Sequence, residues 1–124
     1  MTDFAISYDL KAGNPSPHKA FLDAAESEGL LYVWKGQSYV NRLPNTTIWG
    51  VFDNREEANA AFSRALATAT AVLGYKVTMT KRLTCEFTNG IVNSDVRKVP
   101  DPAYTGVTSF ETSRLHQLND PFFA

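Results

Sequence analysis

The residue best suited to chemistry is Asp9, near the end of an apolar stretch at residues 4–10. Apolar side chains recur there at every second position, which predicts a strand with one buried face: Phe4, Ile6, Tyr8 and Leu10. Asp9 lies on the opposite face with Ala5 and Ser7. Two interpretations stay open. Asp9 either begins the turn-rich segment at residues 9–15, or it is a strand-end carboxylate that can hold a divalent cation.

The other reactive side chains are isolated in the sequence. His18 begins a predicted helix and His116 lies in the C-terminal tail, and we expect both to be surface groups. Cys85 is the one cysteine, so the chain forms no internal disulfide, and within a predicted strand it is typical of a small buried hydrophobe. The sequence contains no phosphate-binding glycine loop, zinc-ligand spacing or nucleophile–base motif.

Composition limits the class of protein. A chain of 124 residues with 44% hydrophobic and 20% charged residues is typical of one globular domain with a real core. The formal net charge of −1 argues against a strongly basic nucleic-acid-binding surface, although Lys81-Arg82 and Arg97-Lys98 leave room for a local basic patch. No secretion signal or membrane-spanning segment is visible, so we expect a cytoplasmic protein that does not enter a membrane.

Two helices are predicted from their end signals. Ser16 and Pro17 begin the first, and Gly29 ends it. The second covers residues 54–73, where Asn54 and Glu57 resemble a capping box. Its apolar stripe is rich in alanine, which predicts a helix lying close to a sheet.

Strands are predicted at residues 30–34, 39–43, 46–52 and 75–87, with a hairpin turn at Pro44-Asn45. Gly50 indicates a bulge or a close backbone approach. A second hairpin turn at residues 88–90 leads to a weak return strand at residues 91–96. No regular pattern follows residue 100, yet the apolar Phe122 and Phe123 suggest that the end of the chain docks on this subunit or on a neighbour.

This order predicts an α+β, ferredoxin-like βαββαβ fold with an additional C-terminal strand and an extended tail. We expect a domain at residues 1–99 and a docked C-terminal extension at residues 100–124. Two helices cover one sheet face only, and the aromatic residues are too many for the other face to be left in water. The sequence therefore predicts a homodimer through the sheet, with five candidates for its open face: Tyr32, Trp34, Tyr39, Trp49 and Tyr75.

Two stretches also resemble a known family. Residues 4–10, an apolar strand ending in Tyr8-Asp9 before an aliphatic residue, and residues 43–49, a threonine-rich turn leading to Trp49, are similar to the small CRISPR-associated ferredoxin-fold nucleases and the SinR-like and VapD-like proteins. The resemblance spans residues 3–87. It implies a homodimer in which Asp9 from two copies, with Ser7 and Tyr8 beside it, holds one Mg²⁺ or Mn²⁺ for endonuclease hydrolysis of RNA or DNA.

Two other functions remain open beside the nuclease. The same dimer would serve as a non-catalytic scaffold for a protein partner, since members of this family also have structural roles. A small-molecule-binding regulatory domain is the third alternative, because this fold class hosts many functions. A nuclease needs Asp9 paired across a two-fold axis, a scaffold needs only the dimer and a partner surface, and a regulatory domain needs a closed pocket.

Overall fold

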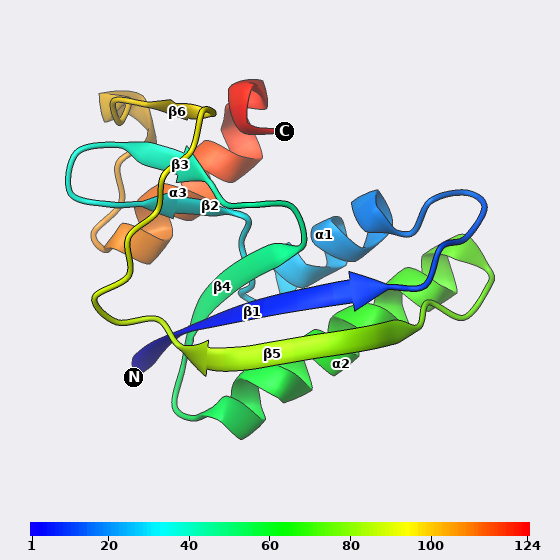
Figure 1. Cartoon of the computed structure of the whole chain (residues 1–124). Coiled ribbons are helices and arrows are strands. Elements are labelled where there is room, and N and C mark those ends of the chain that lie inside the picture. The colour runs from blue at the N-terminus through cyan, green and yellow to red at the C-terminus, as the bar shows by residue number, and fades with distance from the viewer.

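The computed structural model describes residues 1–124 and shows an α+β protein with two antiparallel three-stranded sheets and three α-helices (Figure 1). Sheet A has the order β4-β1-β5, built from Thr47–Phe52, Thr2–Leu10 and Met79–Glu86. Sheet B has the order β2-β3-β6, built from Val33–Lys35, Val40–Arg42 and Arg97–Lys98. The helices are α1 (His18–Ser27), α2 (Arg55–Leu73) and α3 (Ser109–Asn119), and two 3-10 turns cover Pro102–Tyr104 and Pro121–Phe123.

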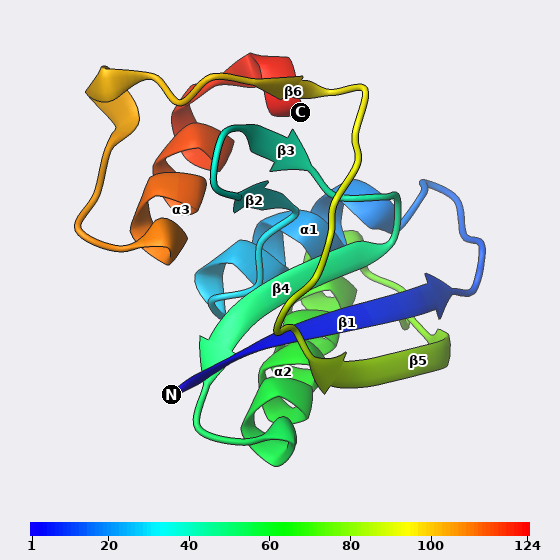
Figure 2. The same cartoon turned by 60° about the vertical axis from the view of Figure 1, so that its left-hand side comes forward.

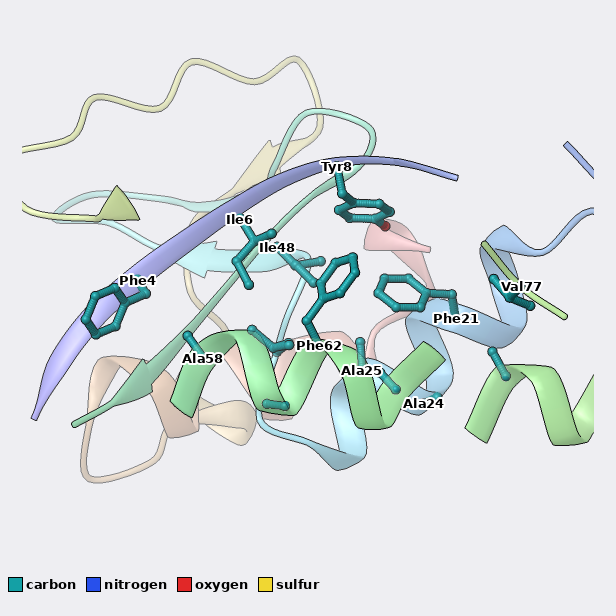
Figure 3. Packing of buried hydrophobic residues seen from close by; sticks show 14 residues of the cluster. Phe4, Ile6, Tyr8, Phe21, Ala24, Ala25, Ile48, Ala58, Phe62 and Val77 are labelled. Atoms are coloured by element: carbon teal, nitrogen blue, oxygen red, sulfur yellow. The ribbon is translucent and has the colours of Figure 1, made fainter. Parts of the chain in front are cut away.

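Strand β1 is central in sheet A, and it has the one buried face that its alternation predicts. It pairs antiparallel with β4 on one side and with β5 on the other. Phe4, Ile6 and Tyr8 are each no more than 3% exposed and face the helices. In Figure 3 the Tyr8 ring lies beside those of Phe21 and Phe62, and the three ring centroids are 4.9 to 5.4 Å apart. This aromatic group joins β1 to both helices.

Both predicted helices form, and a glycine with positive φ follows each of them. Asn54 accepts a hydrogen bond from the Glu57 amide at 2.9 Å, so it caps α2, and Gly74 follows α2 with a φ of 77°. Gly29 follows α1 with a φ of 80°. At the start of α1 the residue in the cap position is Pro17 rather than Ser16, whose Oγ lies 3.5 Å from the His18 amide. The start of α1 therefore has no strong side-chain cap.

Gly50 confirms the predicted close approach of two backbone segments. A side chain at this buried strand position would collide with the carbonyl oxygen of Gly29, which lies just after α1. The missing side chain therefore lets the end of α1 rest directly on β4.

The predicted hairpin at Pro44-Asn45 is wrong. The chain does turn there, with the Thr47 amide donating to the Pro44 carbonyl at 3.1 Å, but β3 and β4 then enter different sheets. A single bridge between Leu31 and Trp49 is what remains of pairing between the strand after α1 and β4. The strand order is thus compatible with a ferredoxin-like arrangement in which the strand after α1 bridges β4 only at Leu31 and then continues into sheet B as β2.

The predicted return strand at residues 91–96 is also wrong, since none of these residues belongs to a strand, although the Arg42 amide of β3 donates to the Val96 carbonyl at 2.9 Å just before β6. The additional C-terminal strand is the two-residue β6, which pairs with β3. Helix α3 was not predicted at all, although Thr108 caps it: the Thr108 hydroxyl accepts from the Glu111 amide, and the Glu111 carboxylate accepts from the amide of Val107, one residue before the cap.

Figure 2 shows α3 lying against sheet B, on the side of β2. Strand β2 is an edge strand, and side chains of α3 bind its free backbone groups. Gln117 accepts from the Tyr32 and Val33 amides at 2.8 and 3.3 Å, and Ser113 accepts from the Lys35 amide at 2.9 Å. The C-terminal segment therefore docks on its own chain, and Phe123 is fully buried against Val33 and Val40.

Trp49 links the two sheets. It is 1% exposed, packs with Leu31 and Leu43, and donates from Nε1 to the Val33 carbonyl at 2.7 Å. We had expected Trp49 on an open sheet face, but Phe87 and Phe110 of the same chain cover it. Of the other four candidates, Tyr39 alone is exposed, and the rest are partly buried within the chain. The surplus of aromatic residues is therefore largely buried by sheet B and the tail.

Candidate functional site

Asp9 lies near the C-terminal end of β1. Because Tyr8 points toward the helices and side chains alternate along a strand, Asp9 lies on the opposite face of sheet A. Figure 1 shows that α1 and α2 leave that face uncovered. Its side chain is exposed and forms no ion pair, although it sits directly opposite Lys81 in the antiparallel register. The register shifts between Asp9 and Leu10, and the Thr80 hydroxyl donates to the Asp9 carbonyl at 3.3 Å. The carboxylate is therefore free to bind a cation from solvent.

Ser7 and Tyr8 lie on opposite faces of the strand. Ser7 is exposed on the same face as Asp9, where Thr47 and Leu83 are its cross-strand neighbours. Tyr8 points toward the helices and is 3% exposed. Of the two residues beside Asp9, only Ser7 shares its surface.

The open face of sheet A also carries apolar groups. Leu83 is 65% exposed. Cys85 lies two residues further along β5 on the same face and is also exposed, although the sequence predicts that it is buried. Beside them is a groove of about 300 Å³, whose apolar lining includes Ala5, Phe87 and Ile91. This surface is more apolar than an exposed strand face in water usually is.

Most side chains of the predicted basic patches contact other residues of the same chain. Arg82 lies over the Phe62 ring at 5.4 Å, and Arg97 lies over the Tyr39 ring at 4.7 Å. Lys98 forms an ion pair with Asp120, which lies between α3 and the last 3-10 turn. Lys81 is the one member of these pairs that shares the open face with Asp9.

No group of three or more histidine, cysteine, aspartate or glutamate side chains is gathered to hold a metal ion within one chain. A single exposed carboxylate supplies the hard oxygen donor that Mg²⁺ or Mn²⁺ prefers, but it supplies only part of a coordination shell. Asp9 is therefore a single oxygen donor, and a metal site here would need further ligands from outside the chain.

The two histidines differ. His18 is exposed at the start of α1, as expected. His116, which we expected at the surface, is fully buried beside Tyr104 and Phe123. Its Nδ1 donates to the Thr112 carbonyl at 2.9 Å while Nε2 accepts from the Asp101 amide at 3.0 Å, so the ring is a neutral structural group.

A second polar site, which the sequence did not indicate, lies on the helix side of sheet A. A cavity of about 400 Å³ is lined by residues of β1, α1, β3 and the turn before β4: Tyr8, His18, Leu22, Arg42, Asn45 and Thr46. Burial raises the pKa of the Tyr8 phenol to about 12, although Arg42 partly opposes this rise. Burial also lowers the pKa of the Arg42 guanidinium.

None of the helices combines the length and the apolar character that crossing a bilayer requires. Comparison of the chain with family models, with curated proteins and with solved structures found no match in any of the three. The likeness to the CRISPR-associated, SinR-like and VapD-like proteins therefore stays a prediction from the two motifs.

Proposed function

We propose that this chain is a homodimeric, nucleic-acid-associated protein that acts as a divalent-metal-dependent endonuclease. The observation that carries the proposal is Asp9, an exposed carboxylate without an ion pair on the open face of a central strand. A carboxylate in that position faces any second copy that covers this face. Two Asp9 residues would then hold one Mg²⁺ or Mn²⁺, which neither chain holds alone.

The proposed fold is ferredoxin-like. Its support is the position of β1 between β4 and β5, both antiparallel to it, with two helices on one face. The bridge from Leu31 to Trp49 extends the order on the β4 side. Folds of this kind leave one sheet face free, and burying that face is a common way to form a dimer.

The proposed dimer is supported by the open face rather than by the aromatic residues that first suggested it. Leu83 is largely exposed there, and the groove beside Ala5 and Phe87 is apolar. Covering such a surface with a second copy removes apolar area from water. The exposed charges of Asp9 and Lys81 would then need partners in the contact, and for Asp9 the shared cation is that partner.

The residues near Asp9 suit a phosphodiester substrate. The bound cation would supply a Lewis acid that lowers the pKa of water and stabilises charge on the phosphate. Asp9 would hold the cation in place, and Lys81, opposite Asp9 on β5, would attract the nucleic-acid backbone. Ser7, on the same face with Leu83 as its cross-strand neighbour, would lie within the dimer contact and support Asp9.

The test is cleavage of labelled RNA and DNA with Mg²⁺ or Mn²⁺ by the wild type and Asp9→Asn. We expect the variant to keep its fold and to lose about a thousandfold in rate, because the amide removes the charge that attracts the cation. The matched control is Asp53→Asn, an exposed carboxylate at the other end of the sheet, which should cleave normally. Equal rates for Asp9→Asn and wild type would exclude the site, and no cleavage by any of them would favour the scaffold.

A further inference from the structure

The cavity on the helix side of sheet A contains an unusual arrangement of charge. Arg42 on β3 is half-buried, forms no salt bridge, and has no carboxylate near enough to affect its pKa. Its guanidinium lies 4.1 Å from the centre of the Tyr32 ring, and one nitrogen, Nη1, donates to the Leu43 carbonyl at 3.1 Å. A partly buried cation with no counter-ion is costly, so an anion in the cavity would stabilise it.

Tyr8 supplies the independent observation. Tyr8 is 3% exposed as a residue and lines the cavity together with Arg42, and its hydroxyl forms no hydrogen bond within the chain. Because this hydroxyl opens onto the cavity and is not enclosed by the chain, it is available to form a hydrogen bond with a ligand there. The rings of Phe21 and Phe62 fix the Tyr8 ring from below, so the hydroxyl is held in position.

The other side of the cavity is also favourable to an anion. His18, the first residue of α1, lines it, and the first turn of α1 contains no acidic residue. Because Pro17 provides no side-chain cap, the positive end of the helix is not neutralised by the chain itself. Hydrogen-bond donors therefore line the cavity from β1, from β3 and from the first residue of α1.

We propose that this cavity binds the phosphate group of a small organic phosphate monoester, with Arg42, Tyr8 and His18 as its ligands. A tetrahedral phosphate offers oxygens in several directions, which matches donors from three elements, whereas a carboxylate offers two oxygens in one plane. The cavity volume of about 400 Å³ exceeds that of a phosphate ion and leaves room for an attached group beside Leu22 and Asn45.

This site is independent of the proposed nuclease site. Tyr8 and Asp9 are neighbours in the chain but point to opposite faces of sheet A. Phosphate binding therefore requires neither a dimer nor a metal ion, and Asp9→Asn should leave it unchanged.

The experiment is calorimetric titration of the full chain with ribose 5-phosphate, inorganic phosphate, ribose and acetate. We expect both phosphates to bind and ribose and acetate not to bind. Arg42→Gln should weaken ribose 5-phosphate by about a hundredfold, because it removes the charge that pairs with the ligand. Tyr8→Phe keeps the ring packing and removes one hydrogen bond, so it should weaken binding about tenfold.

Arg97→Gln is the matched control, since Arg97 also stacks on a tyrosine but lies outside the cavity.

Thermal unfolding distinguishes binding from a structural role. Without ligand, the unfolding temperature of Arg42→Gln should equal or exceed that of the wild type. Ribose 5-phosphate should raise the unfolding temperature of the wild type but not that of Arg42→Gln. The proposal is overturned if the wild type binds neither phosphate at about 10 mM, ten times a weak Kd of about 1 mM. Equal binding by Arg42→Gln, or equal binding of acetate, would also overturn it.

Discussion

At the scale of single residues, the face of a strand or helix on which a reactive side chain lies decides whether that side chain is exposed to solvent or buried. Asp9 and Tyr8 are adjacent, yet one is open to solvent and the other is buried against two phenylalanines. The alternation of β1 predicted this division. It could not predict that Arg42, more than thirty residues later, would line the same cavity as Tyr8.

His116 and Cys85 show where residue-level reasoning fails. The sequence places His116 in a polar tail, but two hydrogen bonds to backbone groups and contacts with two aromatic rings allow its burial. Cys85 lies in a strand as expected, but on the face without helices. Which face of a strand is covered depends on the tertiary packing and not on the residue type.

Gly50 provides a test at this scale. We expect Gly50→Ala to lower the free energy of unfolding by about 1–3 kcal/mol, because its Cβ would collide with the Gly29 carbonyl and push α1 off β4. Chemical denaturation measures the effect. The control is Gly74→Ala, where positive φ creates strain but no atom lies nearby. A Gly50→Ala protein as stable as the wild type would show that α1 does not rest on β4 as described.

At the scale of elements, local signals predicted α1, α2 and β1 because each carries its own start, stop or period. Asn54, Glu57 and Gly74 define α2 without any help from the rest of the chain. Helix α3 escaped prediction because its buried face is polar: Thr112, Ser113 and His116. It docks by hydrogen bonds to the edge of β2, and such contacts leave no apolar period in the sequence.

The C-terminal 3-10 turn is held by an ion pair that depends on pH. A hydrogen bond from Lys98 is the main cause that lowers the pKa of Asp120, and Asp120 also accepts from the Phe122 amide at 3.0 Å. Because the folded pKa is below the unfolded value of about 3.9, this stabilisation is present above that pH and is lost as the pH falls through the folded pKa.

We therefore expect the contact of Phe123 with Val33 and Val40 to loosen below about pH 4, before the aromatic group around Tyr8 does. Proton NMR of the ring-shifted valine methyl signals follows this directly. In Asp120→Asn those signals should show the loosened state already at neutral pH, because the charge that pairs with Lys98 is absent. Valine signals of the wild type that stay constant relative to the core down to pH 3 would contradict this account.

At the scale of the whole molecule, the chain consists of sheet A with α1 and α2, and sheet B with α3 (Figure 2). Trp49 links the two parts by its hydrogen bond to the Val33 carbonyl. The sequence predicted the first part and the central place of β1. It did not predict sheet B, because its strands are two or three residues long and are stabilised by distant segments such as Phe123. Strands that short carry no recognisable period.

The exposed site and the cavity lie on opposite faces of sheet A, which allows separate tests of the two proposals. The nuclease proposal depends on a second copy covering the face with Asp9 and Leu83. Its central claim is that one metal ion is shared between two chains, and this claim precedes any question about the substrate.

The most direct measurement is therefore the binding stoichiometry of Mn²⁺, determined by electron paramagnetic resonance while sedimentation gives the mass of the same sample. The account predicts a dimer that binds one Mn²⁺ per two chains, and an Asp9→Asn dimer that binds none, because both donors at the two-fold axis are lost. A monomer, or a dimer in which Asp9→Asn binds Mn²⁺ as the wild type does, would contradict it.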